Sequence, residues 1–154
     1  IADEPISALD TSSQAQVANL LVDLVHEFKM GMVFISHDLS IVRRISDRVA
    51  VMYLGKIVEI GTTSQIWENP SHPYTRALVS AIPHADGASF MPSDLPGDVP
   101  NPMNPPSGCR FHPRCQLALP KCTTEEPQFV TLTDNREVSC FLQREGESPA
   151  SITL

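Results

Sequence analysis

The sequence has no run of about 18 apolar residues, which is roughly the length a helix needs to cross a bilayer. Basic residues are also few, because 11 Lys and Arg stand against 18 Asp and Glu, giving a formal net charge of −7. A nucleic-acid-binding protein usually presents a basic face, so this charge argues against that class. No secretion signal and no internal repeat are found. The hydrophobic content of 42% is ordinary for a globular protein.

The chain begins Ile1-Ala2-Asp3-Glu4-Pro5, without an initiating methionine. These residues are typical of the end of a buried strand, and a complete domain is not expected to begin in the middle of a core strand. We therefore expect the chain to be the C-terminal portion of a longer subunit.

Hydrophobic periodicity predicts the first elements. Apolar residues recur at helical spacing over residues 14–30, and Gly31 suits the position just past a helix end. The apolar run 32–36 is expected to be a buried parallel strand. A shorter helix is expected over residues 39–45.

A hairpin is expected next, with strands at 48–54 and 57–60 separated by Gly55-Lys56. Thr62 or Thr63 is predicted to cap a helix that runs through Trp67. Pro73 fits the first turn of another helix. Alternating strands and helices imply an α/β fold with a parallel sheet and helical crossovers.

Two acids follow the first apolar residues directly, and a second predicted strand ends in Ser36-His37-Asp38. The carboxyl ends of parallel strands meet at one edge of a sheet, where ligands gather. We therefore expect His37 to approach Asp3 and Glu4. One carboxylate at such a place can hold Mg²⁺ on phosphates while the next activates water. A solvated turn and a structural histidine are the alternatives.

These residues resemble the motifs of an ABC-type ATPase. Residues 1–5 are similar to the Walker B end, Ser-Ala-Leu-Asp at 7–10 to the D-loop, and Ile-Ser-His-Asp at 35–38 to the switch-histidine loop. Residues 14–17 and 69–78 narrow the resemblance to the ATP-binding subunits of bacterial oligopeptide, dipeptide and nickel importers. It extends to about Leu142 and implies a partial P-loop NTPase, or RecA-like, sheet.

The resemblance also implies residue roles. Asp3 would hold Mg²⁺, Glu4 would be the general base, and His37 would contact the γ-phosphate of ATP. Ser7 and Asp10 would shape the interface with a second ATP-binding subunit. Two transmembrane permease subunits would be the other partners, at the cytoplasmic face of the membrane, with no direct peptide contact.

Three motifs of that family are absent: the G-x-x-x-x-G-K-[ST] loop, the glutamine loop and the Leu-Ser-Gly-Gly-Gln signature. Without the glycine-rich loop the main phosphate grip is gone. We expect the isolated chain to bind ATP poorly and to show no meaningful turnover. A metal-binding interaction module and a helicase- or recombinase-type ATPase are rival interpretations.

Four cysteines are confined to one segment, at Cys109, Cys115, Cys122 and Cys140. A cytosolic setting disfavours disulfides, and the absence of a tight C-x2-4-C pair weakens zinc without excluding it. Four thiolates suit an iron–sulfur cluster. Some members of the resembling family carry a [4Fe–4S] cluster on such cysteines, so that cluster is expected here, with Zn²⁺ or free thiols as alternatives. Arg110 and Arg114 could donate to the cluster sulfurs or offset the thiolate charge, and solvated side chains are the equal alternative. His112 is a weaker candidate ligand, for which a surface role is favoured.

Six prolines between Met91 and Ser107 predict a linker. The expected domains are therefore an ATPase half at 1–83, a linker at 84–107, an irregular cysteine-rich extension at 108–143 and a frayed tail at 144–154. The sequence does not separate oligopeptides, dipeptides and nickel as cargo.

Overall fold

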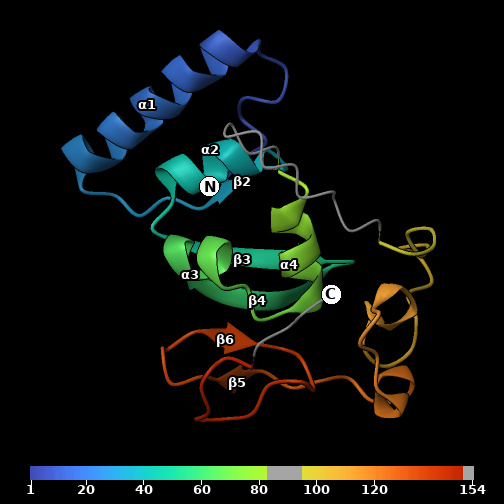
Figure 1. Cartoon of the computed structure of the whole chain (residues 1–154). Coiled ribbons are helices and arrows are strands. Elements are labelled where there is room, and N and C mark those ends of the chain that lie inside the picture. The colour runs from blue at the N-terminus through green and yellow to red at the C-terminus, as the bar shows by residue number, and fades with distance from the viewer. Residues whose placement is uncertain (83–94, 151–154) are drawn as a thin grey trace. The chain divides into compact units, whose positions relative to one another are not determined.

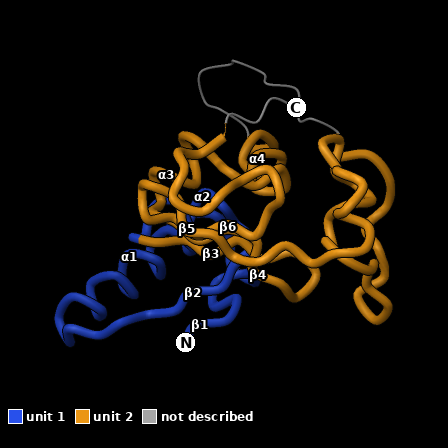
Figure 2. The backbone as a smooth tube through the Cα atoms, turned by 90° about the horizontal axis from the view of Figure 1, so that it is seen from below, with its two compact units in different colours: residues 1–47 blue, residues 48–154 orange. Residues whose placement is uncertain are grey.

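The computed structural model describes residues 1–82 and 95–150. It divides into two compact units, residues 1–47 and residues 48–154 (Figure 2). Each unit is described by itself. The division lies at Asp47, whereas the sequence suggested a boundary after residue 83. None of the helices in the described part of the chain is both long and apolar enough to cross a lipid bilayer.

The first unit is built on a β–α–β crossover. Strand β1 (Ala2–Asp3) pairs in parallel with β2 (Phe34–Ile35), with Ala2 opposite Phe34 and Asp3 opposite Ile35. Helix α1 (Thr11–Phe28) connects them, and α2 (Leu39–Ile45) follows (Figure 1). The predicted parallel pairing and both helices are confirmed.

Helix α1 ends before Gly31, the residue at which the sequence predicted its end. Lys29 adopts the left-handed conformation at φ 51°, and its N–H donates to His26 O at 3.3 Å. The N–H of Met30 donates to Val25 O at 3.0 Å, so the last carbonyls are satisfied before Gly31 is reached. The prediction that Gly31 ends this helix was therefore wrong.

The second unit opens with the predicted hairpin. Strands β3 (Arg48–Tyr53) and β4 (Lys56–Thr62) are antiparallel. The turn between them is Leu54-Gly55, with φ values of 45° and 78°. Two positive φ values match the type I′ turn, whose twist fits the flanking strands. The hairpin is confirmed, and its turn lies one residue earlier than expected.

The cysteine-rich segment contributes strands to the same sheet. Strand β6 (Glu137–Val138) pairs with β4, and β5 (Val130–Thr131) pairs with β6, giving the antiparallel order β3-β4-β6-β5 (Figure 1). Two short 3-10 helices, His112–Arg114 and Pro120–Thr123, precede these strands. The segment is therefore not a wholly irregular extension. The mixed α/β class is confirmed, and a wider RecA-like parallel sheet stays a prediction.

Two further helices follow β4. Helix α3 (Thr63–Glu68) begins with a capping box, because Thr62 Oγ1 accepts from the N–H of Gln65 while the Gln65 side chain accepts from the N–H of Thr62. Helix α4 (Pro73–Ser80) has Pro73 in its first turn. Both predicted starts are confirmed.

An aromatic cluster joins the hairpin to the later segment. The ring centroids of Tyr53 and Tyr74 lie 4.7 Å apart, and Phe111 lies 5.2 Å from Tyr53 and 5.5 Å from Tyr74. Phe111 is 2% exposed. These distances are typical of packed aromatic rings, so Tyr74 is a packing residue.

The described part of the tail is bound to the sheet region. The N–H of Gly146 donates to Thr131 O at 2.9 Å, and the N–H of Thr133 donates to Glu147 O at 3.1 Å. Residues 144–150 thus make backbone contacts with the strand region, and the expected fraying of the tail stays a prediction. Residues 151–154, and residues 84–94 of the expected linker, lie outside the described residues.

Candidate functional site

Glu4 and His37 meet where β1 and β2 end. Glu4 Oε1 lies 2.8 Å from His37 Nδ1 and accepts the backbone N–H of His37 at 3.2 Å. The parallel pairing of the strands places both residues at one sheet edge, since Glu4 N donates to Ile35 O. The predicted approach of His37 to Glu4 is confirmed. Because a carboxylate only accepts, the proton of this contact is on Nδ1.

The second oxygen of Glu4 has a different environment. Among the described residues, Glu4 Oε2 is buried and has no hydrogen-bond partner. Asp3, one residue earlier, is exposed. The hydroxyl of Ser7 donates to the carbonyl oxygen of Glu4 at 3.1 Å and closes the turn after β1. Glu4 therefore keeps one oxygen in contact with His37 and one available as an acceptor.

Contact with Glu4 raises the pKa of His37 above its ordinary value, first through the hydrogen bond and then through the negative charge. We expect Glu4→Gln to lower the pKa of His37 toward its ordinary value, because the charge is lost while the shape is kept. An NMR titration of the imidazole in both proteins measures this.

Asp38→Asn is the control for that titration, because the charge of Asp38 raises the pKa of His37 less than Glu4 does. Asn also keeps the acceptor with which Asp38 caps α2. An unchanged His37 pKa in Glu4→Gln would contradict the contact.

Asp10 lies at the start of α1. Its Oδ1 accepts from the N–H groups of Ser12 and Ser13 at 3.1 and 3.0 Å, and the two serine hydroxyls donate to the same carboxylate. These hydrogen bonds hold the pKa of Asp10 well below its usual range. Asp10 is thus an N-cap, a role that the sequence interpretation did not assign.

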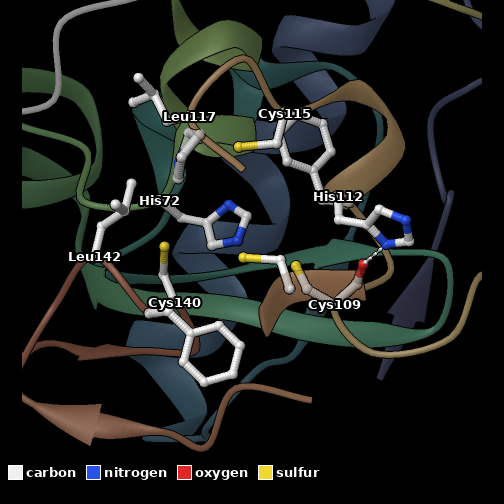
Figure 3. Close-up of a pocket in the computed structure, with 11 residues that line it drawn as sticks. His72, Cys109, His112, Cys115, Leu117, Cys140 and Leu142 are labelled. Carbon is white, nitrogen blue, oxygen red and sulfur yellow. Dashed lines mark hydrogen bonds between the residues drawn. The ribbon is translucent and has the colours of Figure 1, made fainter. Parts of the chain in front are cut away.

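All four cysteines are free and line one cavity (Figure 3). Burial raises the pKa of Cys109, Cys115 and Cys140, that of Cys140 to about 12. The neighbouring thiols raise the pKa of Cys140 further, which is the effect expected of groups held close together. The structure therefore gathers thiols that are up to 31 positions apart in the sequence, as 140 − 109 shows.

Each of the four sulfurs has a backbone N–H donor nearby. The N–H of Leu119 donates to Cys122 Sγ at 3.3 Å. The other three thiols also have backbone N–H donors, and each of these hydrogen bonds acts to lower the pKa of its thiol. The donors are Phe111 and His112 for Cys109, Leu117 for Cys115, and Leu142 for Cys140. Such donors stabilise a thiolate relative to a thiol.

The expected side-chain donors lie elsewhere. Nη1 of Arg110 donates to Leu54 O, and Nε of Arg114 donates to Pro96 O at 3.3 Å. These two guanidinium groups, which the sequence offered as possible donors to the sulfurs or as solvated side chains, thus bond backbone carbonyls. Arg110 thereby links the cysteine-rich segment to the turn of the β3–β4 hairpin, and Arg114 links it to Pro96, which precedes the segment in the chain. His112 does line the cavity, with Nδ1 2.9 Å from Cys109 O.

A buried polar network next to this cavity was not predicted. Glu59 is 0% exposed, and its two oxygens accept from the N–H groups of Ser71 and His72 at 2.7 and 2.9 Å. Arg136, 2% exposed, lies 3.5 Å from Glu59 and donates to Ser71 Oγ at 2.8 Å. The signal in the sequence was a carboxylate inside the apolar run 57–60.

Residues 58–122 match the family described as the C-terminal region of oligopeptide/dipeptide transporters. These matched residues belong to the oligopeptide/dipeptide transporter family. The matched residues include β4 from Val58 onward, all of α4 and three of the four cysteines of the cavity.

Relatives of this transporter family extend the likeness over most of the chain. It is 51% identical over 142 residues to a dipeptide transport ATP-binding protein of Haemophilus influenzae, covering 92% of this chain and 43% of that protein. It is 49% identical to an oligopeptide transport ATP-binding protein of Bacillus subtilis (92% and 44%) and 50% identical to a di/tripeptide transport ATP-binding protein of Pseudomonas aeruginosa (91% and 43%). The chain thus spans less than half the length of these relatives.

Proposed function

We propose that this chain is part of the ATP-hydrolysing, energy-coupling subunit of an ABC importer for oligopeptides or dipeptides. The observation that carries the proposal is the contact between Glu4 and His37 at the ends of two parallel strands. A carboxylate and an imidazole at such an edge suit nucleotide chemistry. The names of the relatives, which are ATP-binding proteins of peptide transport, support the same reaction.

In this proposal Glu4 is the general base. Its buried Oε2 accepts a proton from the attacking water, while Oε1 stays bonded to His37. The exposed carboxylate of Asp3 suits Mg²⁺, a hard cation that prefers oxygen ligands. When bound, Mg²⁺ neutralises charge on the phosphates of ATP. His37 contacts the γ-phosphate.

The partners follow from the same proposal. Ser7 and Asp10 face a second ATP-binding subunit. Both are exposed, so that subunit can contact them, and Asp10 keeps its hydrogen bonds to the first turn of α1. Two permease subunits anchor the pair at the cytoplasmic face of the membrane. Peptide does not contact this chain.

The test compares the isolated chain with a full-length subunit that contains it. The isolated chain should show no ATP turnover above background, because it lacks the glycine-rich phosphate loop. In the full-length subunit, Glu4→Gln should lower kcat by about 10²-fold or more, since general base catalysis contributes about 10²–10⁴-fold.

Glu27→Gln is the matched control, because Glu27 is exposed on α1 and away from the strand ends. It should leave kcat unchanged. The proposal is wrong if Glu4→Gln hydrolyses ATP as fast as the Glu27 variant. ATP turnover by the isolated chain would contradict only the prediction that this chain is inactive, and not the role of Glu4.

We further propose that the cysteine cavity holds a [4Fe–4S] cluster within the 108–143 module that follows the ATPase half (1–83) and the linker (84–107). Four free thiols on one cavity, each with a backbone N–H donor, are a suitable ligand set. Within the described residues, no three His, Cys, Asp or Glu side chains are grouped to hold one metal ion. Zinc needs four ligands about 2.3 Å from a single ion, whereas a cluster spreads its thiolates over several irons.

Protein purified without oxygen should be brown and contain iron and sulfide in equal amounts. Cys140→Ser should lose both, because one of the four thiolate ligands is removed. Thermal unfolding followed by circular dichroism checks that the variant is folded. Stoichiometric zinc without sulfide, or no metal after reconstitution, would refute the cluster.

A further inference from the structure

His72 lies between the buried polar network and the cysteine cavity. It is 1% exposed, and as the N-cap of α4 its Nδ1 accepts the N–H of Tyr74 at 3.0 Å. Burial lowers the pKa of His72 to about 3, so the ring is neutral. A neutral imidazole carries one proton, and with Nδ1 acting as acceptor that proton is on Nε2.

The imidazole of His72 lines the same cavity as the four thiols (Figure 3). Of the residues that line it, only His72 and His112 carry a side-chain N–H. Nδ1 of His112 lies 2.9 Å from Cys109 O, and a carbonyl oxygen only accepts, so the Nδ1–H of His112 donates to the backbone. The two rings are therefore used differently: His112 donates through Nδ1 to a backbone carbonyl, whereas His72 accepts through Nδ1 and keeps its Nε2–H as a donor.

The backbone of His72 is fixed by strand β4. Glu59 accepts the N–H groups of Ser71 and His72, and Nε2 of Gln143 donates to Ser71 O at 2.9 Å. The ring centroid of His72 lies 5.8 Å from that of Phe111. A donor whose backbone and ring are both held is preorganised, so little ordering is needed when it bonds to a ligand in the cavity.

We propose that the Nε2–H of His72 donates a hydrogen bond to the sulfur-ligated group in this cavity and raises its reduction potential. The inference rests on the proposed cluster. One-electron reduction adds a negative charge to a cluster, and a hydrogen bond to its sulfurs stabilises the more negative state. His72 is thus a positioning and tuning residue, while the cysteines remain the ligands.

Two variants separate the donor from the helix cap. In His72→Asn the side-chain oxygen takes the place of Nδ1 and keeps the cap, but nothing replaces Nε2. In His72→Gln the amide nitrogen reaches the position of Nε2, and the cap is lost. Both variants lose ring packing against Phe111, so a drop in Tm common to both reports packing alone.

The midpoint potential is measured by reductive titration with dithionite, which supplies the electron. We expect His72→Asn to make reduction about tenfold less favourable, a shift of about 59 mV to lower potential for a one-electron couple. His72→Gln should stay near the wild-type value. His112→Asn, which keeps a donor for Cys109 O, should also stay there and is the matched control.

Labelling tests the contact without relying on a stable variant. With ¹⁵N-histidine in the His112→Asn background, the reduced cluster should show one coupled nitrogen by pulsed electron paramagnetic resonance. Absence of that coupling, or a wild-type potential in His72→Asn, overturns the His72 inference and leaves the cluster proposal intact. Wild-type protein without iron and sulfide overturns both.

Discussion

Glu59→Ala should lower the free energy of unfolding of the second unit by about 3–5 kcal/mol. The substitution leaves the Arg136 guanidinium, 3% exposed, without its buried counter-charge. It also leaves the N–H groups of Ser71 and His72 without acceptors. Breaking one side of a buried pair costs more than the pair contributes, because the remaining charge stays desolvated. Urea unfolding followed by circular dichroism measures the loss.

Glu59→Gln separates the loss of the negative charge from the loss of the side chain's shape. The amide keeps the shape but offers one oxygen to two backbone donors, so we expect a smaller loss of about 1–3 kcal/mol. Glu126→Ala is the surface control, since Glu126 is half-exposed and paired with Lys56 at 2.8 Å. It should cost less than about 1 kcal/mol. Equal stabilities of Glu59→Ala and Glu126→Ala would show that the network does not hold the unit.

The same variants have a pH signature. Burial raises the pKa of Glu59, so the folded protein binds this proton more tightly than the unfolded chain does. The contribution of Glu59 to stability is therefore greatest below its unfolded pKa and falls as pH rises through the folded pKa. Glu59→Gln should lack that slope, and the difference between the two unfolding curves isolates it.

Gly108→Ala is the second change with a large expected effect. Gly108 has φ 64°, and a methyl group there would come within 2.5 Å of Cys122 O and 2.9 Å of Thr123 C. The left-handed conformation costs a non-glycine residue about 1–2 kcal/mol, and the backbone clash displaces the segment that carries Cys122. We expect lower stability together with reduced iron uptake, measured by unfolding and metal analysis.

Gly97→Ala is its matched control. Gly97 has φ 72°, but a methyl group there meets nothing within 4 Å. It should show only the cost of the left-handed conformation, with normal iron uptake. If the two variants behave alike, the close approach of Gly108 to the Cys122 backbone is not needed by the cavity.

Local signals predicted the elements well. The spacing of apolar residues located α1, and Thr62 and Pro73 marked the starts of α3 and α4. The end of α1 was missed because Lys29 takes a conformation that glycine usually supplies. The turn of the hairpin was displaced for a related reason, since Leu54 also has a positive φ.

The sequence predicted the side-chain contact in the first unit but not the side-chain partners in the second. Glu4 and His37 were expected to approach because parallel strands end at one edge, and the 2.8 Å contact confirms it. For Arg110 the sequence left a cysteine sulfur and solvent open as partners, and the structure shows its guanidinium bonding Leu54 O. Neighbours in sequence do not fix the direction of a long side chain, because packing elsewhere selects its rotamer.

The sequence by itself determined the order of the helices and strands, the edge shared by Glu4 and His37, and the presence of four thiols in one segment. Periodicity and capping act over a few residues, so they can be read locally. Only the tertiary structure decided that β6 pairs with β4, that Glu59 and Arg136 are buried together, and that His72 lines the cavity of the cysteines. The first two contacts join residues 77 or more positions apart, as 137 − 60 and 136 − 59 show, and His72 lies 37 positions before Cys109. All three depend on long-range packing that no local pattern records.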